Sequence, residues 1–316
     1  MQLMYGLGLL LIICLVQAYD DPSVGEHNPV YIEDIQPTNG ERITGGWEAR
    51  EAEIPYQISL RMVAATGQVF SCGGSIIHPE WIITAAHCLA NRITFVVRLG
   101  AQNLTQPTFI IEENISNRVM HPRYSETGGS GQPDDIALLK LSQSIAWERT
   151  IQPIRLQSSK DKDTDYANTF LTVSGYGLTA DRAQGGTSSE VLMLTNLRGI
   201  SNQECRRWFS TFIQPQTVCA QYFNNPKQSA CSGDSGGPLT LMEKDGEMTM
   251  IGIVSFGSSQ GCTHGIPTAY VRPGYYHSWI TESTGIDFDW DSSAPEPDTY
   301  ELDTPEQGYE VHVVDQ

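Results

Sequence analysis

The chain has 316 residues, which is enough for one large or two small hydrophobic cores. Its formal net charge is −18, and this acidic balance argues against nucleic-acid binding, which requires a basic face. The negative charge is concentrated near the two ends of the chain. Six acids and one Arg give residues 19–42 a charge of −5, and ten acids without Lys or Arg give residues 286–316 a charge of −10. The part between these flanks therefore carries only −3.

Residues 1–18 are predicted to be a secretory signal peptide. The apolar run Leu3–Val16 is followed by Gln17-Ala18, a small residue at the cleavage point, although no Lys or Arg precedes the run. The alternative is a membrane anchor, but the run is short for a bilayer span. No other stretch could span a membrane, so we expect a secreted, extracellular protein that is not bound to membranes.

Residues 19–42 are polar and acidic and contain three prolines, which predicts an extended propeptide rather than a folded unit. Arg42 stands directly before Ile43-Thr44-Gly45-Gly46. We interpret Arg42 as the cleavage point for a trypsin-like activating protease. The alternative is an ordinary loop arginine.

From residue 54 to residue 273 the chain shows short apolar or alternating runs separated by turn residues, a pattern typical of β-barrels or sandwiches. The runs lie at 54–60, 73–77, 81–84, 95–99, 136–141, 170–173, 191–194, 238–241, 248–256 and 268–271. Helical signals are few. The clearest lies at 275–283 after Pro273, and a second surrounds Cys205.

The stretch Cys231–Pro238 presents Ser235 between glycines. A serine hydroxyl needs a base to become a nucleophile, and the oxyanion that its attack creates needs backbone N–H donors. The N–H groups of Gly233 and Ser235 are the candidate donors. Alone, this stretch could be a glycine turn, so the rest of the chain must supply a base and an acid that orients it.

The base is predicted to be His87, the only one of seven histidines in an Ala-Ala-His-Cys context, and Asp134 and Asp135 compete for the orienting role. In the order His, Asp and Ser, and with the activation site at Arg42, these motifs resemble the trypsin/chymotrypsin family of serine endopeptidases. The pattern around residues 255–257 and 261–267 is most similar to arthropod chymotrypsin-like and brachyurin-type enzymes.

The resemblance covers residues 43–285 and implies an all-β fold of two antiparallel six-stranded β-barrels with a C-terminal helix. His87 and Asp135 would lie on the first barrel and Ser235 on the second. The family alignment selects Asp135, which leads into an apolar strand, and leaves Asp134 facing solvent. After cleavage, the amine of Ile43 would pair with the buried Asp234. Neither a cofactor nor a metal is expected.

Six cysteines remain once Cys14 leaves with the signal peptide, and an even set in a secreted chain indicates disulfides with fifteen possible pairings. The resemblance implies the pairs Cys72–Cys88, Cys205–Cys219 and Cys231–Cys262. Because residues 19–42 contain no cysteine, a cleaved propeptide would not stay covalently attached.

The resemblance also places Ser229, six residues before Ser235, at the base of the substrate pocket, where an Asp would select Arg or Lys. Ser255-Phe256-Gly257 would pair with extended substrate backbone, and Gly257 would leave the pocket mouth open. Thr268 would narrow the pocket from the opposite wall. We therefore expect cleavage after apolar residues: Phe, Tyr, Leu or Met first, smaller aliphatic residues second.

Two sequons, at Asn103 and Asn114, could carry glycans or could occur by chance. The tail 286–316 is predicted to be disordered because of its acidic composition. The alternative is an interaction segment in which Tyr300 and Tyr309 are sulfated.

The sequence thus predicts a secreted endopeptidase made as a zymogen. Its expected partners are protein or peptide substrates, an activating protease, and serpins or other protease inhibitors. Two alternatives stay open: a non-catalytic homologue that binds partners through its cleft or tail, and an enzyme with a single target guided by the tail. Because such homologues usually lose a catalytic residue, the presence of His87, Asp135 and Ser235 favours catalysis.

Overall fold

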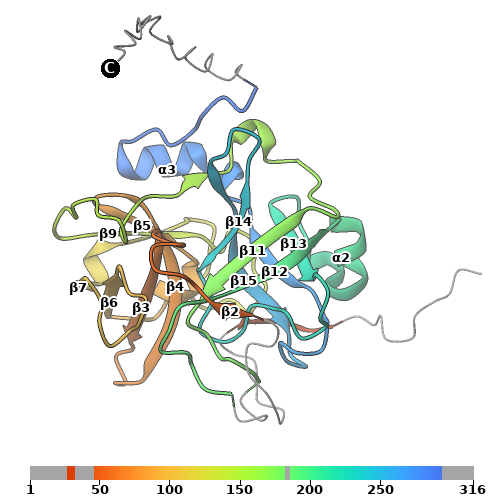
Figure 1. Cartoon of the computed structure of the whole chain (residues 1–316), viewed down its shortest axis with the longest axis horizontal. Coiled ribbons are helices and arrows are strands. Elements are labelled where there is room, and N and C mark those ends of the chain that lie inside the picture. The colour runs from red at the N-terminus through yellow and green to blue at the C-terminus, as the bar shows by residue number, and fades with distance from the viewer. Residues whose placement is uncertain (1–26, 33–45, 182–185, 294–316) are drawn as a thin grey trace, which may run out of the picture.

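The computed structural model describes residues 27–32, 46–181 and 186–293. Their strands form two antiparallel β-structures, one from each half of the chain (Figure 1). The first contains β3 (Gln57–Val63), β4 (Val69–His78), β5 (Trp81–Thr84), β6 (Thr94–Leu99), β7 (Phe109–Asn114), β8 (Arg118–Met120) and β9 (Ala137–Lys140). The second contains β11 (Phe170–Gly175), β12 (Met193–Ile200), β13 (Thr217–Tyr222), β14 (Pro238–Met242), β15 (Met248–Ser258) and β16 (Thr268–Val271).

The second half is a closed six-stranded barrel. Its strands follow the order β15-β14-β11-β12-β13-β16, and β16 pairs again with β15. Three short strands extend this sheet: β1 (Pro29–Tyr31) and β10 (Arg155–Leu156) pair with β15, and β2 (Trp47–Glu48) pairs with β12. The barrel predicted for this half is confirmed.

The first half is a seven-stranded row in the order β7-β6-β3-β4-β5-β9-β8. The strands at its two ends, β7 and β8, are joined by the single 3-10 turn Ile115–Asn117, so the row must curl back around its own core. No ladder between described strands closes it, because the turn splits one long strand into two pieces that pair with different neighbours, β6 and β9. The barrel predicted for this half is therefore confirmed in part, as a half-barrel whose described strands do not close into a ring.

Alternating burial explains why residues 94–99 form a strand in this wall. Phe95, Val97 and Leu99 are fully buried, whereas Thr94, Val96 and Arg98, which alternate with them, are half-buried. Successive side chains of a strand point to opposite faces, so this spacing places one apolar face on the core. The partner strand matches it in register, with Leu60 opposite Val97.

Within the described residues, three α-helices accompany the strands: α1 (Ala86–Leu89), α2 (Asn202–Phe209) and α3 (His277–Thr284). Helix α2, predicted around Cys205, begins with a cap in which the Ser201 hydroxyl accepts the N–H of Glu204 at 3.1 Å. Helix α3 buries Ile280 in the core of the first half, and it ends at Gly285 in the left-handed conformation (φ 75°). No helix within the described ranges is long and apolar enough to cross a bilayer.

Residues 286–293 pack onto the domain, which differs from the disordered tail predicted from residue 286 onward. The indole N–H of Trp290 donates to the carbonyl of Leu156 at 2.8 Å, and the Arg155 guanidinium lies 3.9 Å from the centre of the indole ring. Phe288 packs against the core of the first half. Aromatic side chains thus hold a segment whose acidic composition alone predicted disorder. Residues 294–316, with both candidate sulfation sites, lie outside the described residues.

Candidate functional site

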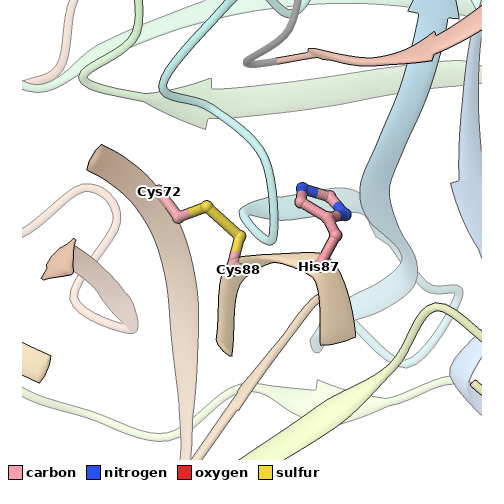
Figure 2. A group of neighbouring side chains, drawn as sticks. All are labelled: Cys72, His87 and Cys88. Carbon is pink, nitrogen blue, oxygen red and sulfur yellow. A yellow bond between two sulfur atoms is a disulfide. The ribbon is translucent and has the colours of Figure 1, made fainter. Parts of the chain in front are cut away.

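His87 lies on the short helix α1, which a disulfide fixes to the wall of the first barrel. The Cys72–Cys88 bond joins β4 to α1, and Figure 2 shows it beside the imidazole of His87. Helix α1 has only four residues, and Ala85 at its start gives no side-chain cap. We infer that the covalent bond supplies rigidity that the short helix lacks, at the place where a general base needs a fixed position.

The three predicted disulfides are confirmed, since Cys205–Cys219 and Cys231–Cys262 are also bonded. Two clusters in the described residues have the proximity of metal ligands, namely Cys72 with His87 and Cys88, and Asp181 with Cys231 and Cys262. Each cluster contains a disulfide, and sulfur atoms bonded to each other offer no thiolate to a metal.

Asp135 is fully buried and holds His87 by two hydrogen bonds. One carboxylate oxygen lies 2.6 Å from Nδ1 of His87, and the other accepts the backbone N–H of His87 at 2.9 Å. A third donor comes from the second barrel, since the Ser255 hydroxyl donates to the Asp135 carboxylate at 2.6 Å. These contacts fix the orientation of the imidazole and join the two halves of the chain at one carboxylate.

Asp134 is buried, which contradicts the expectation that it faces solvent. Its carboxylate pairs with Arg123 at 2.8 Å and accepts the phenol hydroxyl of Tyr276 at 2.9 Å. Its backbone is left-handed, with φ 60°. Tyr276 comes from the C-terminal end of the chain, so the partner that allows this burial is not visible in the local sequence around Asp134.

The loop that carries Ser235 is shaped by two glycines and is bonded to both barrels. Gly233 and Gly236 have φ of 102° and 77°, a region that side chains rarely allow, and a Cβ on Gly236 would lie 2.1 Å from the Thr84 hydroxyl. The carbonyl of Ser235 accepts the N–H of Gly73 on β4 at 2.7 Å. The loop therefore lies directly against the strand end that leads into His87.

Asp234, the residue before the candidate nucleophile, is buried with its carboxylate turned inward. Its two oxygens accept the N–H groups of Gly177 and Cys231 at 2.7 and 2.9 Å. Burial raises the pKa of Asp234 to about 6, against the opposing effect of these hydrogen bonds. No ion pair joins it to a cation in the described parts of the chain. Arg42 and Ile43 lie outside the described residues.

The base of the predicted pocket is neutral. The hydroxyls of Ser229 and Thr268 lie 3.0 Å apart and share a hydrogen bond, so Ser229, expected at the base of the pocket, contacts Thr268, expected on the wall opposite Gly257. Phe256 is buried, and its ring packs edge-to-face with the ring of Phe209, with the ring centres 5.5 Å apart. The site residues expected on β15 are thus held in place by packing and by the bond from Ser255 to Asp135.

A buried carboxylate that sequence reasoning missed supports the pocket wall behind the Cys231–Cys262 disulfide. Asp181 accepts the N–H of Cys262 and the hydroxyl of Thr263, both at 2.7 Å. A Cβ on Gly261 would come within 2.7 Å of its carboxylate. Asp181 has no motif around it, so the sequence offered no signal for this role.

A second missed element is the segment His27–Ile32, which lies in the cleft. Strand β1 pairs with Phe256, Gly257 and Ser258 of β15, and the ring of Tyr31 stacks on His87 with the centres 4.2 Å apart. The run Val30-Tyr31-Ile32 is short, β-prone and apolar, and that was the available signal. The acidic character of the surrounding residues obscured it.

Comparisons with known proteins agree with this geometry. The trypsin family model matches residues 43–280. A collagenase from Hypoderma lineatum is 34% identical over 250 residues, covering 78% of this chain and 89% of that protein. A chymotrypsin from Phaedon cochleariae is 34% identical over 273 residues, covering 85% and 92%. A trypsin II-P29 from Gallus gallus is 36% identical over 245 residues, covering 77% and 89%.

The fold matches as well. A solved structure of HL collagenase superimposes with a TM-score of 0.67 at 32% identity, covering 77% of this chain and 98% of that one. The family match spans well over half of the sequence, and the insect relatives agree with the predicted resemblance to arthropod chymotrypsin-like enzymes. The chain therefore belongs to the trypsin family and is a serine endopeptidase.

Proposed function

We propose that the protein is secreted as a zymogen, is activated by cleavage after Arg42, and then hydrolyses peptide bonds after apolar residues through an acyl-enzyme. The observation that carries this proposal is the buried Asp135 carboxylate 2.6 Å from Nδ1 of His87, on a helix that a disulfide joins to β4, the strand bonded to the Ser235 carbonyl. A carboxylate in that position keeps the proton on Nδ1 and leaves Nε2 to act as the base.

In the proposed reaction, the Ser235 hydroxyl oxygen attacks the substrate carbonyl carbon while its proton moves to Nε2 of His87. The N–H groups of Gly233 and Ser235 stabilise the oxyanion. When the tetrahedral intermediate collapses, the C–N bond breaks and His87 returns the proton to the leaving amine. Water then attacks the acyl-enzyme, again giving a proton to His87, and the release of the acid restores the Ser235 hydroxyl.

Specificity follows from the neutral pocket base. Because the side chains at the base are the neutral hydroxyls of Ser229 and Thr268, which share one hydrogen bond, the base offers no charge to a Lys or Arg side chain. A pocket without a charged partner rejects a cation strongly, because the cation would be desolvated without compensation. The pocket is accordingly proposed to accept Phe, Tyr, Leu or Met and, less well, smaller aliphatic residues.

Secretion also allows glycosylation at Asn114 and Asn103. The Asn114 side chain is exposed and Asn103 is half-buried, and each side-chain oxygen accepts from the residue two positions later, Ser116 and Thr105. Asn114 is thus the more accessible acceptor. Deglycosylation of the secreted protein followed by mass measurement of its peptides tests both positions.

A peptide panel that varies only the residue before the scissile bond tests the proposed function. The panel is run on protein cut after Arg42, with uncut protein and the Ser235→Ala variant as controls. We expect cleavage after Phe, Tyr and Leu by the cut wild type alone. Cleavage after Arg would contradict the pocket assignment, and silence on every peptide would favour a non-catalytic or single-target protein.

A further inference from the structure

The segment His27–Ile32 occupies the cleft as an added strand. Pro29 lies opposite Ser258, Val30 opposite Gly257, and Tyr31 opposite Phe256, in an antiparallel ladder on β15. This stretch of β15 is the one proposed to pair with substrate backbone, and strand addition is a common way for a protein to bind an extended peptide. The chain's own N-terminal flank therefore lies where a substrate would lie.

Tyr31 covers the proposed base. Its ring stacks on the imidazole of His87 at an interplanar angle of 20°, and its side chain is buried. The phenol oxygen lies 3.1 Å from that of Tyr124 and accepts from the Gln132 amide at 3.3 Å. Burial and the nearby Asp135 carboxylate raise the pKa of Tyr31 far above its usual range, so the phenol stays neutral. The aromatic side chain is thus held by specific partners.

Ile32 is buried beside the nucleophile loop, with 1% of its surface exposed. It belongs to a cluster of buried side chains that includes Ala230, the Cys231–Cys262 pair and Tyr270. The carbonyl of Ile32 accepts the hydroxyl of Ser232 at 2.8 Å. Ser232 lies three residues before Ser235, so Ile32 is hydrogen-bonded to the nucleophile loop through its carbonyl, while its side chain packs beside that loop.

His27 fixes the other end of the segment. Its N–H donates to the carbonyl of Trp208 at 2.6 Å, and its ring stacks on the Trp208 indole with the centres 5.3 Å apart. The segment is thus anchored at its first residue, along its ladder with β15, and at its last residue. Within the segment His27, Tyr31 and Ile32 are buried, and this burial indicates complementarity between the sequence of the segment and the cleft.

We propose that residues His27–Ile32 are an intramolecular ligand of the substrate cleft, in which Tyr31 covers His87 and Ile32 occupies the apolar pocket. The proposal rests on the proposed function in one respect, that the cleft binds substrate. In the uncut chain the ligand is covalently attached, which gives it an effective concentration in the millimolar range and excludes substrate. After cleavage at Arg42 no disulfide retains it, so it becomes a separate competitive inhibitor.

The same contacts define the substrate class. Peptides that place an aromatic side chain on His87 and an aliphatic side chain in the pocket are expected to bind best. At the pocket position, Ile32 therefore adds isoleucine to Phe, Tyr, Leu and Met as a preferred residue.

A synthetic peptide with the sequence of residues 27–32 tests the ligand on protein cut after Arg42. We expect competitive inhibition, with KM raised and kcat unchanged. Burial of an isoleucine side chain predicts that the Ile32→Asp peptide binds about 10- to 100-fold more weakly. A Val30→Pro peptide, which lacks an N–H in the ladder, is expected to bind weakly as well, and a scrambled peptide is the matched control. Equal inhibition by all four peptides, or none at millimolar concentration, would overturn the proposal.

Direct binding separates this proposal from the proposed function. The fluorescently labelled peptide is titrated into the cut Ser235→Ala variant, which needs no turnover for a readout. If the labelled peptide binds but the cut wild type cleaves no panel peptide, the proposed ligand is supported and the proposed endopeptidase specificity is refuted. Cleavage of the panel without binding of the peptide would refute the ligand alone.

Hydrogen exchange of the full uncut chain tests the contact in cis. In the variant that combines Tyr31→Ala with Ile32→Asp, we expect faster exchange at residues 27–32 and 256–258, with β3 and β6 unchanged. Because the segment lies outside both barrels, the variant is expected to fold. Identical exchange in wild type and variant would overturn the proposal.

Discussion

The buried carboxylate of Asp234 gives a stability prediction for the uncut chain. Burial raises the pKa of Asp234 to about 6, against an ordinary value of 3.8. A folded-state pKa above the unfolded value means that the folded chain binds the proton more tightly. The favourable contribution is therefore fully present below about pH 4 and is lost as the pH rises through 6. A difference of about two pKa units corresponds to about 3 kcal/mol at 1.36 kcal/mol per unit.

The Asp234→Asn variant isolates this cost, because every other acid titrates equally in both proteins. The free energy of unfolding is measured by urea denaturation of uncut wild type and variant at pH 4 and pH 7.5. Between these values the wild type should lose about 3 kcal/mol relative to the variant. The amide also forfeits one acceptor for the N–H groups of Gly177 and Cys231, but that loss does not depend on pH and cancels in the comparison.

The reasoning is refuted if the difference between the two proteins is the same at both pH values. A second comparison uses chain cut after Arg42. If the new amine of Ile43 pairs with Asp234, the carboxylate gains a countercharge, and the relative loss between pH 4 and pH 7.5 should shrink or reverse. An unchanged loss in the cut protein would refute the pairing of Ile43 with Asp234 while leaving the burial argument intact.

Four further outcomes are expected. Asp135→Asn should lower kcat by about four orders of magnitude without unfolding the protein, and a loss below tenfold would contradict the orienting role. Ser255→Ala removes a hydrogen bond to that carboxylate and should lower kcat/KM about 10- to 100-fold, with an unchanged value as the contrary result. If the freed Ile43 amine pairs with Asp234, the pairing would raise the pKa of that amine above its unfolded value of about 8. The active form would then be fully present below that value, and activity should fall reversibly as the pH rises through the folded-state pKa. Full activity well beyond about pH 11 would count against it. Trp290→Ala should destabilise the protein by about 1–2 kcal/mol in a thermal melt, with Trp290→Phe as the milder control, and equal melting temperatures would show that the docked segment adds nothing.

The sequence motifs predicted most of the fold and of the catalytic site, because each motif reflects a local requirement of the chemistry. A nucleophile loop needs positive φ, and the glycines at 233 and 236 supply it. The disulfides were recoverable only through the resemblance, since spacing alone left fifteen pairings open. The choice of Asp135 over Asp134 also came from alignment to the family, and it is Asp135 that contacts His87.

What the sequence did not reveal depends on partners that are distant in the chain. Asp134 is buried because Tyr276 of the C-terminal region reaches it, 142 positions away. Asp181 supports a wall formed by residues around Cys262, 81 positions later. A local pattern reports the period of burial and the chemistry of a motif, but it carries no information on which remote group satisfies a buried carboxylate.

The acidic flanks show the same limit in another form. Composition averaged over residues 19–42 and 286–316 predicted unfolded segments, yet a few aromatic and aliphatic residues in each flank pack onto the domain. Tyr31 and Ile32 lie in the cleft, and Trp290 lies on Arg155. Average charge describes how a segment is solvated, whereas docking needs only two or three side chains that fit existing surfaces.

Cleavage after Arg42 would change two contacts of the Ser235 loop at once. On its inner side, the loop is held by Asp234, whose carboxylate pairs with no cation among the described residues. Ionisation of this buried carboxyl at neutral pH lowers the free energy of unfolding by about 3 kcal/mol. On its pocket side, the Ser232 hydroxyl is engaged by the carbonyl of Ile32. Breaking one peptide bond would free an amine able to neutralise the first contact, and it would detach the segment that makes the second. Activation would then depend on two separable events, and only the release of the segment depends on protein concentration.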